Sequence, residues 1–180
     1  MIDRDAELAL DDAQLLARCE VHLYRASGPG GQHRNKVTSA VRLHHRDTGL
    51  SATATESRSQ HENRRSALRR LRQKLTCEVR RPIDPAVLRV PGVVRECLSQ
   101  PKGSAPGAPQ RVDIGRKDPR FWTVAAFLLD LLECTEGRAG VTSALLKVTT
   151  GSLVRVLRHD RHVLAAAQQI RRRHSLPPLS

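Results

Sequence analysis

The sequence EVHLYRASGPGGQHRNKVTSAVRLHHRDTGLSATAT, residues 20–55, holds the clearest structural pattern in the chain. Apolar and polar side chains alternate in residues 20–25 and again around Val41 and Leu43, which predicts two strands. The residues between these strands, ASGPGGQHRNK at 26–36, are rich in glycine and polar groups. They are therefore expected to form a loop that joins the two strands.

A hairpin and a long helix are expected after this loop. The sequence DTG at 47–49 is a turn signal, so residues 50–55 are predicted to be a third strand paired with the second. Residues 59–80 are predicted to form a helix, because Ala67, Leu68, Leu71 and Leu75 follow i, i+3, i+4 spacing. The other faces of this helix carry basic residues expected to stay free for solvent or RNA: Arg64, Arg65, Arg69, Arg70, Arg72 and Lys74.

The glycine-rich loop is the first candidate for chemistry. Gly28, Gly30 and Gly31 let the backbone approach a ligand closely and adopt positive φ angles. Such loops often place N–H groups against phosphates or oxyanions. Neither a Walker loop nor a GxGxxG motif fits, because no Gly-Lys-Ser/Thr follows and position 33 is histidine. Glycine content alone is equally typical of an ordinary connection.

The complete string carries more information than its glycines. SGPGGQ at 27–32, followed by HRNKVTSAVRL at 33–43, closely resembles the catalytic domain of class I peptide chain release factors. The resemblance continues through HRDTGL at 45–50 and TESRSQHENRRSALRRL at 55–71. Several short motifs thus match at fixed spacing, with the turn, strand and helix signals in the same order.

The resemblance implies a fold and an activity. Residues 1–81, which begin with a short helix expected at about Asp11 to Arg18, would form a GGQ catalytic domain, a small mixed sheet covered by the long helix, within an α+β protein. The protein would be an enzyme that hydrolyses the ester of P-site peptidyl-tRNA beside large-subunit rRNA, without a metal or cofactor. Gly30 and Gly31 would let the backbone enter the peptidyl-transferase cavity. The Gln32 N–H would stabilise the developing charge, while its side chain positions water.

The resemblance also implies RNA contacts and a modification. Residues next to the GGQ triplet are placed for phosphates of rRNA or tRNA. The segment around residues 58–63 would contact RNA, or would cap the long helix and brace the loop. The RNA-binding candidates are Ser27, Gly28, His33, Arg34, Asn35, Lys36, Arg58, Ser59, Gln60, His61 and Asn63. The resemblance implies N-methylation of Gln32, with a glutamine methyltransferase as a partner.

Composition favours a polyanionic partner. Thirty-one Lys and Arg against eighteen Asp and Glu give a net charge of +13, which favours nucleic acid over an anionic membrane surface. No apolar run is long enough to span a membrane, and the acidic start of the chain is neither a secretory signal nor a transit peptide. The cysteines lack zinc-site spacing and are expected to be reduced: Cys19, Cys77, Cys97 and Cys134. We expect a cytoplasmic monomer.

The second half of the chain has a different character. Residues 82–118 are rich in Pro and Gly and are predicted to be a linker, with 101–109 as its most linker-like part. Residues 119–180 are predicted to form a helical module. An amphipathic helix is expected from Asp118-Pro119 to before Gly137. Further helices are expected at 141–148, 151–159 and 161–173.

A helix-turn-helix is one interpretation of residues 142–157. A turn near residues 148–150 separates the expected helices, although Lys147 stands where such motifs often have glycine. Arg155, Arg158 and Arg161 would then contact nucleic acid. Plain packing of three short helices explains the pattern equally well. The arginines at 171–173 are expected to end a helix, where the helix dipole favours cations.

The functional hypotheses follow from these features. No tripeptide resembling a stop-codon reader is recognisable, and GGQ proteins that rescue stalled ribosomes are nearer in size. The leading hypothesis is therefore codon-independent release of the nascent chain. The alternatives are a non-catalytic RNA- or ribosome-binding protein with a GGQ fold, codon-dependent termination with a partner, and a DNA-binding regulator.

Overall fold

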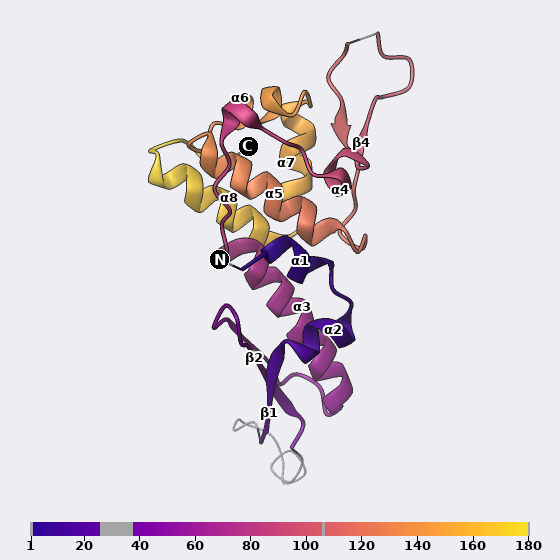
Figure 1. The fold of residues 1–180 in the computed structure, drawn as a ribbon, viewed down its shortest axis with the longest axis vertical. Coiled ribbons are helices and arrows are strands. Elements are labelled where there is room, and N and C mark those ends of the chain that lie inside the picture. The colour runs from indigo at the N-terminus through magenta and orange to yellow at the C-terminus, as the bar shows by residue number, and fades with distance from the viewer. Residues whose placement is uncertain (1, 26–37, 106, 180) are drawn as a thin grey trace. The chain divides into compact units, whose positions relative to one another are not determined.

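The computed structural model describes residues 2–25, 38–105 and 107–179. The fold is α+β, as predicted, with helices and two small antiparallel sheets (Figure 1). The chain divides into two compact units, Met1–Leu75 and Thr76–Ser180. The domain limits predicted from the sequence, 1–81 and 119–180, stay a prediction.

The first unit begins with two short helices. Helix α1 spans Arg4–Ala9, and the Asp3 carboxylate accepts hydrogen bonds from two N–H groups of its first turn. This helix was not expected, because RDAELA is short and mostly polar. Helix α2, Asp12–Ala17, was expected and begins with a capping box formed by Asp11 and Gln14.

A three-stranded sheet follows these helices. Strand β1 spans Cys19–Tyr24, β2 spans Ala40–His45 and β3 spans Ser51–Ala54, in the order β1-β2-β3. Both pairings are antiparallel, so the sheet of described strands is not mixed as predicted. The reason is that each strand pairs with its neighbour in sequence, and such consecutive strands fold back on each other.

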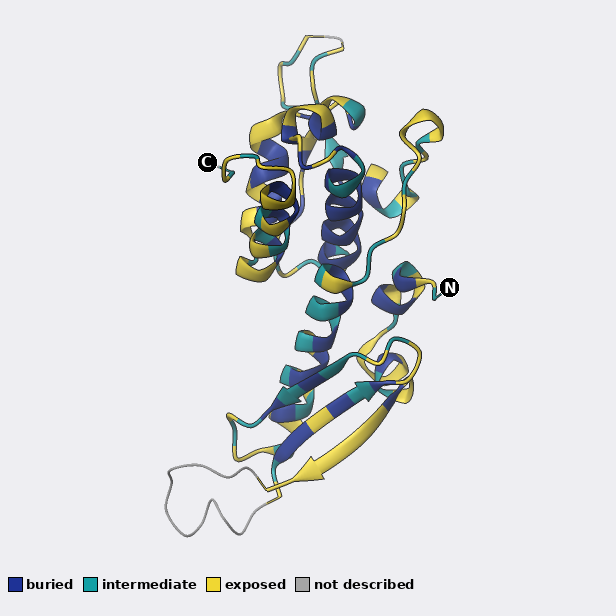
Figure 2. Cartoon of the chain, turned by 90° about the vertical axis from the view of Figure 1, so that its left-hand side faces the viewer, coloured by how far each residue is buried: buried dark blue, intermediate teal, exposed yellow. Residues whose placement is uncertain are grey.

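Burial in this unit is concentrated on β2 and on α3, Gln60–Glu78, which crosses one face of the sheet (Figure 2). Val41 and Leu43 are fully buried, as is Leu71 from the predicted apolar stripe of α3. Their cross-strand partners on β1 are Leu23 and Val21, which are 45% and 38% exposed. Strand β1 is therefore an edge strand whose apolar side chains the described residues leave uncovered.

The second unit is built around α5, Phe121–Cys134, whose residues 121–132 are all buried. The sequence predicted an amphipathic helix, with one apolar face. Helix α5 is instead covered on several sides, because it contacts α4, α6, α7 and α8. Their ranges are Gly92–Arg95, Ala139–Leu145, Thr150–Arg158 and Arg161–Arg173. A helix that is buried all round requires apolar residues on every face, which explains the composition of α5. Among the described residues, no helix is long and apolar enough to cross a membrane.

The predicted linker, residues 82–118, has regular structure. It contains the 3-10 helix η1, Pro85–Val87, helix α4, and the antiparallel pair β4, Leu98–Ser99, and β5, Arg111–Val112. Val94 and Val112 are fully buried, so parts of this segment belong to the core of the second unit. The described residues between β4 and β5 form no further helix or strand.

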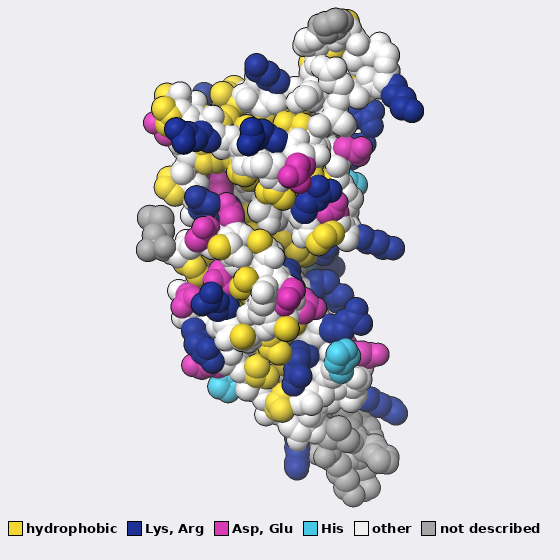
Figure 3. Space-filling view, turned by 45° about the vertical axis from the view of Figure 1, so that its right-hand side comes forward, with side chains coloured by type: hydrophobic (Ala, Val, Ile, Leu, Met, Phe, Trp, Pro, Cys, Tyr) yellow, Lys and Arg dark blue, Asp and Glu magenta, His cyan; other side chains and the backbone are white. Residues whose placement is uncertain are grey.

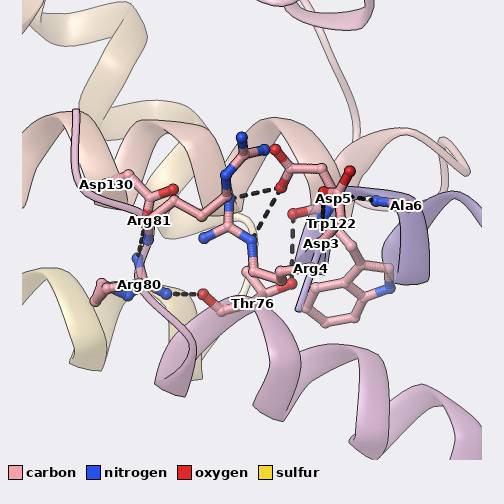
Figure 4. A network of polar contacts seen from close by, with 9 residues as sticks. All are labelled: Asp3, Arg4, Asp5, Ala6, Thr76, Arg80, Arg81, Trp122 and Asp130. Atoms are coloured by element: carbon pink, nitrogen blue, oxygen red, sulfur yellow. Dashed lines mark hydrogen bonds and ion pairs between the residues drawn. The ribbon is translucent and has the colours of Figure 1, made fainter. Parts of the chain in front are cut away.

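A buried acid holds the chain that leaves α3 against the second unit's central helix (Figure 4). Asp130 lies in the middle of α5 and is 2% exposed. Its carboxylate accepts a 3.1 Å hydrogen bond from the Arg81 N–H and lies 3.2 Å from an Arg80 guanidinium nitrogen. Nearby, the Thr76 hydroxyl donates to the Trp122 carbonyl at 3.3 Å. A polar residue inside this apolar helix is thus explained by its partners.

Candidate functional site

The GGQ loop joins β1 to β2 in the chain, because β1 ends at Tyr24 and β2 begins at Ala40. The loop itself lies outside the described residues. This applies to the predicted catalytic residues and to most of the predicted RNA contacts: Ser27, Gly28, Gly30, Gly31, Gln32, His33, Arg34, Asn35 and Lys36. The described part of the site is its base, where the returning chain meets the start of α3.

Asn63 organises this base. Its side chain is 1% exposed, and all of its polar atoms have partners within the chain. The amide nitrogen donates to the Ser39 carbonyl at 2.7 Å and to the Ser57 carbonyl at 2.8 Å. The amide oxygen accepts from the Ser57 N–H at 3.0 Å. Because Ser39 immediately precedes β2, Asn63 ties the returning end of the GGQ loop to the first turn of α3.

The start of α3 is capped by serines and an acid. The Ser59 hydroxyl accepts a hydrogen bond from the Glu62 N–H at 3.3 Å, as an N-cap residue does. The Ser57 hydroxyl accepts from the Ser59 N–H at 3.0 Å and donates to the Glu62 carboxylate. These bonds satisfy polar groups that the helix leaves unpaired at its first turn.

Within residues 58–63, some side chains have the environment expected for capping the helix and bracing the loop, and others have the environment expected for an RNA contact. Asn63 and Ser59 brace the loop and cap the helix, and the burial of Asn63 leaves no surface for a direct RNA contact. Arg58 and His61 are exposed, and no hydrogen bond joins their side chains to other described residues. Gln60 is half-buried. Sequence reasoning missed Ser57 and Ser39, since their roles depend on the distant Asn63.

Two of the basic residues on α3 have structural partners, contrary to expectation. The Arg70 guanidinium donates to the Thr53 carbonyl and to the Glu56 carboxylate, and this hydrogen bond lowers the pKa of Glu56. Arg72 donates to the Leu10 carbonyl at 2.8 Å and to Asp12. These arginines fix strand β3 and the segment between α1 and α2. Lys and Arg side chains nevertheless remain prominent on the surface, with acidic side chains among them (Figure 3).

One group of described side chains has the spacing of a metal site: Glu7, His45 and Asp47. Both ring nitrogens of His45 already have partners, Thr48 Oγ1 at 2.8 Å and Glu7 Oε2 at 3.2 Å. Arg18 lies 3.8 Å from the other oxygen of Glu7. The group therefore connects α1 to the turn between β2 and β3, and the His45 nitrogens and the Glu7 carboxylate are used for that purpose.

The region interpreted as a possible helix-turn-helix consists of α6, a short turn and α7 in the second unit. Lys147 adopts a φ of 55°, the left-handed conformation in which such turns often place glycine. Leu153 and Val156 are fully buried. The two helices contact each other, α5 and, through α7, strand β5.

The three arginines predicted to contact nucleic acid have different environments. The Arg155 guanidinium donates to the Val112 carbonyl at 3.0 Å, so part of it holds β5. The Arg158 side chain is exposed and makes no hydrogen bond with the described residues. Arg161 is exposed at the start of α8, and its Nε donates to His162 Nε2 at 3.0 Å. Arg155 and Arg158 line one common cleft, and Arg161 does not.

Comparison with known proteins finds a family match in the first half of the chain. The sequence model of the RF-1 domain matches residues 11–85, which include α2, the three strands, the GGQ loop and α3. Over these residues the chain is similar to the RF-1 domain of peptide chain release factors. The match ends at Pro85, and residues 86–180 lie outside it.

Individual relatives agree with this assignment. The chain is 40% identical over 74 residues to peptide chain release factor 2 of Sulfurovum sp. (strain NBC37-1) and of Campylobacter concisus (strain 13826). It is 43% identical over 74 residues to peptide chain release factor 2 of Helicobacter pylori (strain G27). Each match covers 41% of this chain and 19% of the relative. The chain therefore spans only a small share of the relatives' length.

Proposed function

We propose that this protein is a release factor-like hydrolase, which frees nascent peptides from P-site peptidyl-tRNA on the ribosome. The observation that supports the proposal is the RF-1 domain match over residues 11–85, which includes Gly30, Gly31 and Gln32. The base of the loop fits this role, because Asn63 ties the returning chain at Ser39 to α3. A loop that enters an RNA cavity benefits from a rigid attachment to its own domain.

In the proposed reaction, water attacks the carbonyl carbon of the ester between the peptide and the terminal ribose of tRNA. The Gln32 N–H donates to the developing oxyanion or to the leaving ribose oxygen, and one preorganised donor of this kind contributes about 3 kcal/mol. The intermediate collapses by breaking the bond to the ribose oxygen, which leaves as a hydroxyl after taking a proton. The peptide keeps the oxygen of water as its new carboxylate. The Gln32 side chain positions the water.

The experiment uses stalled ribosomes that carry labelled peptidyl-tRNA, with peptide release and ribosome co-sedimentation measured in parallel. Wild-type protein is expected to release the peptide, while Gly31→Ala and Gln32→Ala keep ribosome binding and lose most release. Glu20→Gln, an exposed change on β1 outside the predicted site, is the control, and it is expected to release at nearly the wild-type rate. Release by Gly31→Ala at the wild-type rate would refute the assignment of the loop.

Codon independence is a separate part of the proposal. It rests on the absence from the sequence of a recognisable tripeptide that reads stop codons. Release is expected at similar rates with a stop codon, a sense codon or no codon in the ribosomal A site. A strong preference for stop codons would instead indicate termination, alone or with a partner.

Mass spectrometry of the protein after co-expression with a glutamine methyltransferase tests the proposed N-methylation of Gln32.

A second candidate function is binding without hydrolysis. The net charge of +13 favours it, because such a charge attracts RNA whatever the chemistry of the loop. This function predicts ribosome co-sedimentation that falls with salt, and no release of labelled peptide at any protein concentration. The same release experiment therefore decides between the two functions.

A further inference from the structure

A basic cleft of about 790 Å³ lies in the second unit, between the starts of α6 and α7 and the last residues of the chain. Its cationic side chains are Arg138, Arg155, Arg158 and Arg171, and His159 also lines it. No Asp or Glu among the described residues lines it, but Arg138 donates to the carboxylate of Glu136. A concave surface with charges of one sign concentrates the opposite charge, so its occupant is expected to be an anion.

We propose that this cleft binds single-stranded RNA, with phosphates at its arginines and a base against its apolar wall. Arg158 is the principal phosphate ligand in this arrangement, since its side chain is exposed and makes no hydrogen bond with the described residues. Arg155 uses one nitrogen for the Val112 carbonyl. A guanidinium has five N–H donors, so Arg155 keeps donors for a phosphate while its position is fixed.

The apolar wall comes from the end of the chain, through Leu176 and Pro178, and from Val154 of α7. This segment is folded back by defined bonds. The Arg171 Nε donates to the Pro177 carbonyl at 2.8 Å, and another nitrogen of the same guanidinium donates to the Gly137 carbonyl. The wall is therefore attached to the turn before α6, and an apolar surface lies beside the cationic one.

The combination of these two surfaces favours a single strand of RNA over other anions. The volume of the cleft is in the range that holds a ligand of small-molecule size, and a nucleotide is such a group. A base in a duplex is stacked and paired, whereas an unpaired base can be turned out and packed against a protein surface. An acidic peptide would satisfy the arginines but has no flat base for the apolar wall.

The proposal goes beyond peptide release, because the cleft lies outside the RF-1 domain and needs no hydrolysis to bind. Its role would be to give the protein a second RNA contact, on a part of the chain that the family match does not cover. Direct readout of a DNA duplex by α7 is a different arrangement, since the tail residues Leu176, Pro178 and Leu179 also line the cleft.

Gly151 offers a sharp test, because it lines the cleft in the first turn of α7 and an added Cβ would meet nothing within 4 Å. Full-length Gly151→Glu places a negative charge in the cleft, and Gly151→Gln adds a neutral side chain of equal size. The probe is a short single-stranded RNA carrying 4-thiouridine, photo-cross-linked to the protein. Wild type and Gly151→Gln are expected to cross-link to peptides within residues 138–179. Gly151→Glu should reduce these cross-links about tenfold, because like charges repel in the cleft.

A second variant protects the test against a folding defect. Arg158→Ala removes a side chain without internal hydrogen bonds and is expected to weaken the same cross-links and lower the salt dependence of binding. Equal cross-linking by Gly151→Glu and Gly151→Gln, or no cross-link within 138–179, would overturn the proposal. So would equal competition by duplex RNA or by an acidic peptide. Peptide release is not measured, so loss of the proposed hydrolase activity leaves this result unaffected.

Discussion

The Asn63 side chain donates a 2.7 Å hydrogen bond to the Ser39 carbonyl, across a separation of 24 residues in the chain. This bond fixes the point where the GGQ loop returns to the sheet. The same side chain also bonds Ser57 through both its nitrogen and its oxygen. One buried amide therefore joins the loop, the segment before α3 and the helix itself.

Asn63→Ala is expected to destabilise the first unit by about 2–3 kcal/mol, because it leaves buried backbone groups without partners. Hydrogen exchange of peptides around residues 38–65 measures the loss, together with urea unfolding followed by circular dichroism. His61→Ala, an exposed change in the same turn, is the control and should leave exchange unchanged. Protection of the Ser57 and Ser39 segments in Asn63→Ala equal to wild type would contradict this account.

Gly137→Ala is expected to destabilise the second unit by about 1–3 kcal/mol, since both backbone conformation and space oppose a side chain. Gly137 has a φ of 77°, and an added Cβ would lie 3.0 Å from the Arg171 Cα. Fluorescence of Trp122, the single tryptophan, reports unfolding of this unit. Gly140→Ala is the matched control, because nothing lies within 4 Å of its Cβ position in α6. If both variants unfold at the same urea concentration, the clash at Arg171 is irrelevant.

Ser152→Ala is expected to lower the free energy of unfolding of the second unit by about 1–3 kcal/mol, because the buried Val112 N–H loses its partner. The Ser152 hydroxyl is buried and accepts a 2.7 Å hydrogen bond from the Val112 N–H, which joins α7 to β5. The neighbouring Gly151→Ala should be neutral or stabilise by up to about 1 kcal/mol, since alanine favours a helix. Trp122 fluorescence in urea again gives the measurement. A loss of stability in Gly151→Ala equal to that in Ser152→Ala would contradict the role of the hydroxyl.

Alkaline pH is expected to destabilise the protein through Cys19. Burial raises the pKa of this thiol from 9.0 to about 11, so the folded state disfavours the thiolate. The contribution of this shift to stability is complete below pH 9.0 and is lost as the pH rises towards about 11. Urea unfolding on both sides of pH 9.0 measures it, with Cys19→Ala as the control that should show a smaller loss. An identical pH dependence of the two proteins would exclude Cys19 as the cause.

Burial also predicts that the thiols of Cys19 and Cys77 react slowly. The pKa of Cys77 is raised to about 12, mainly by burial, and the thiolate is the reactive form. At neutral pH, Cys19 and Cys77 should therefore alkylate slowly in the folded protein and rapidly in urea. Peptide mass spectrometry after a timed reaction with iodoacetamide distinguishes the sites. Rapid modification of either cysteine without urea would contradict its burial.

Elements with strong periodicity and clear ends were predictable from the sequence. The three strands around residues 20–55 and the helix α8 were expected close to their observed positions. For α8, the Asp160 side chain caps the first turn, accepting from the His162 N–H at 2.9 Å. Local signals determine such elements, so no distant residue has to be known.

The features that were missed depend on distant partners or on weak local signals. Strands β4 and β5 have two residues each, too few for a periodic pattern, and their segment contains several prolines. The role of Asn63 could not be separated from RNA binding without knowing that Ser39 lies beside it. The cleft joins Arg138 to Arg171, which only the packing of α6 beside the tail brings together. Arg171 had been predicted only as part of a cationic helix end.

The folded-back tail has a practical consequence for handling this protein. Residues 177 and 179 bond to Arg171 and Gln168, so the final residues serve as a wall and not as a loose end. A purification tag, fluorescent reporter or surface tether attached after residue 180 would therefore begin one residue beyond Leu179, which lines the cleft. Attachments before Met1 leave this end of the chain unchanged. If the cleft binds RNA as proposed, RNA-binding measurements made with the two kinds of fusion protein are expected to disagree.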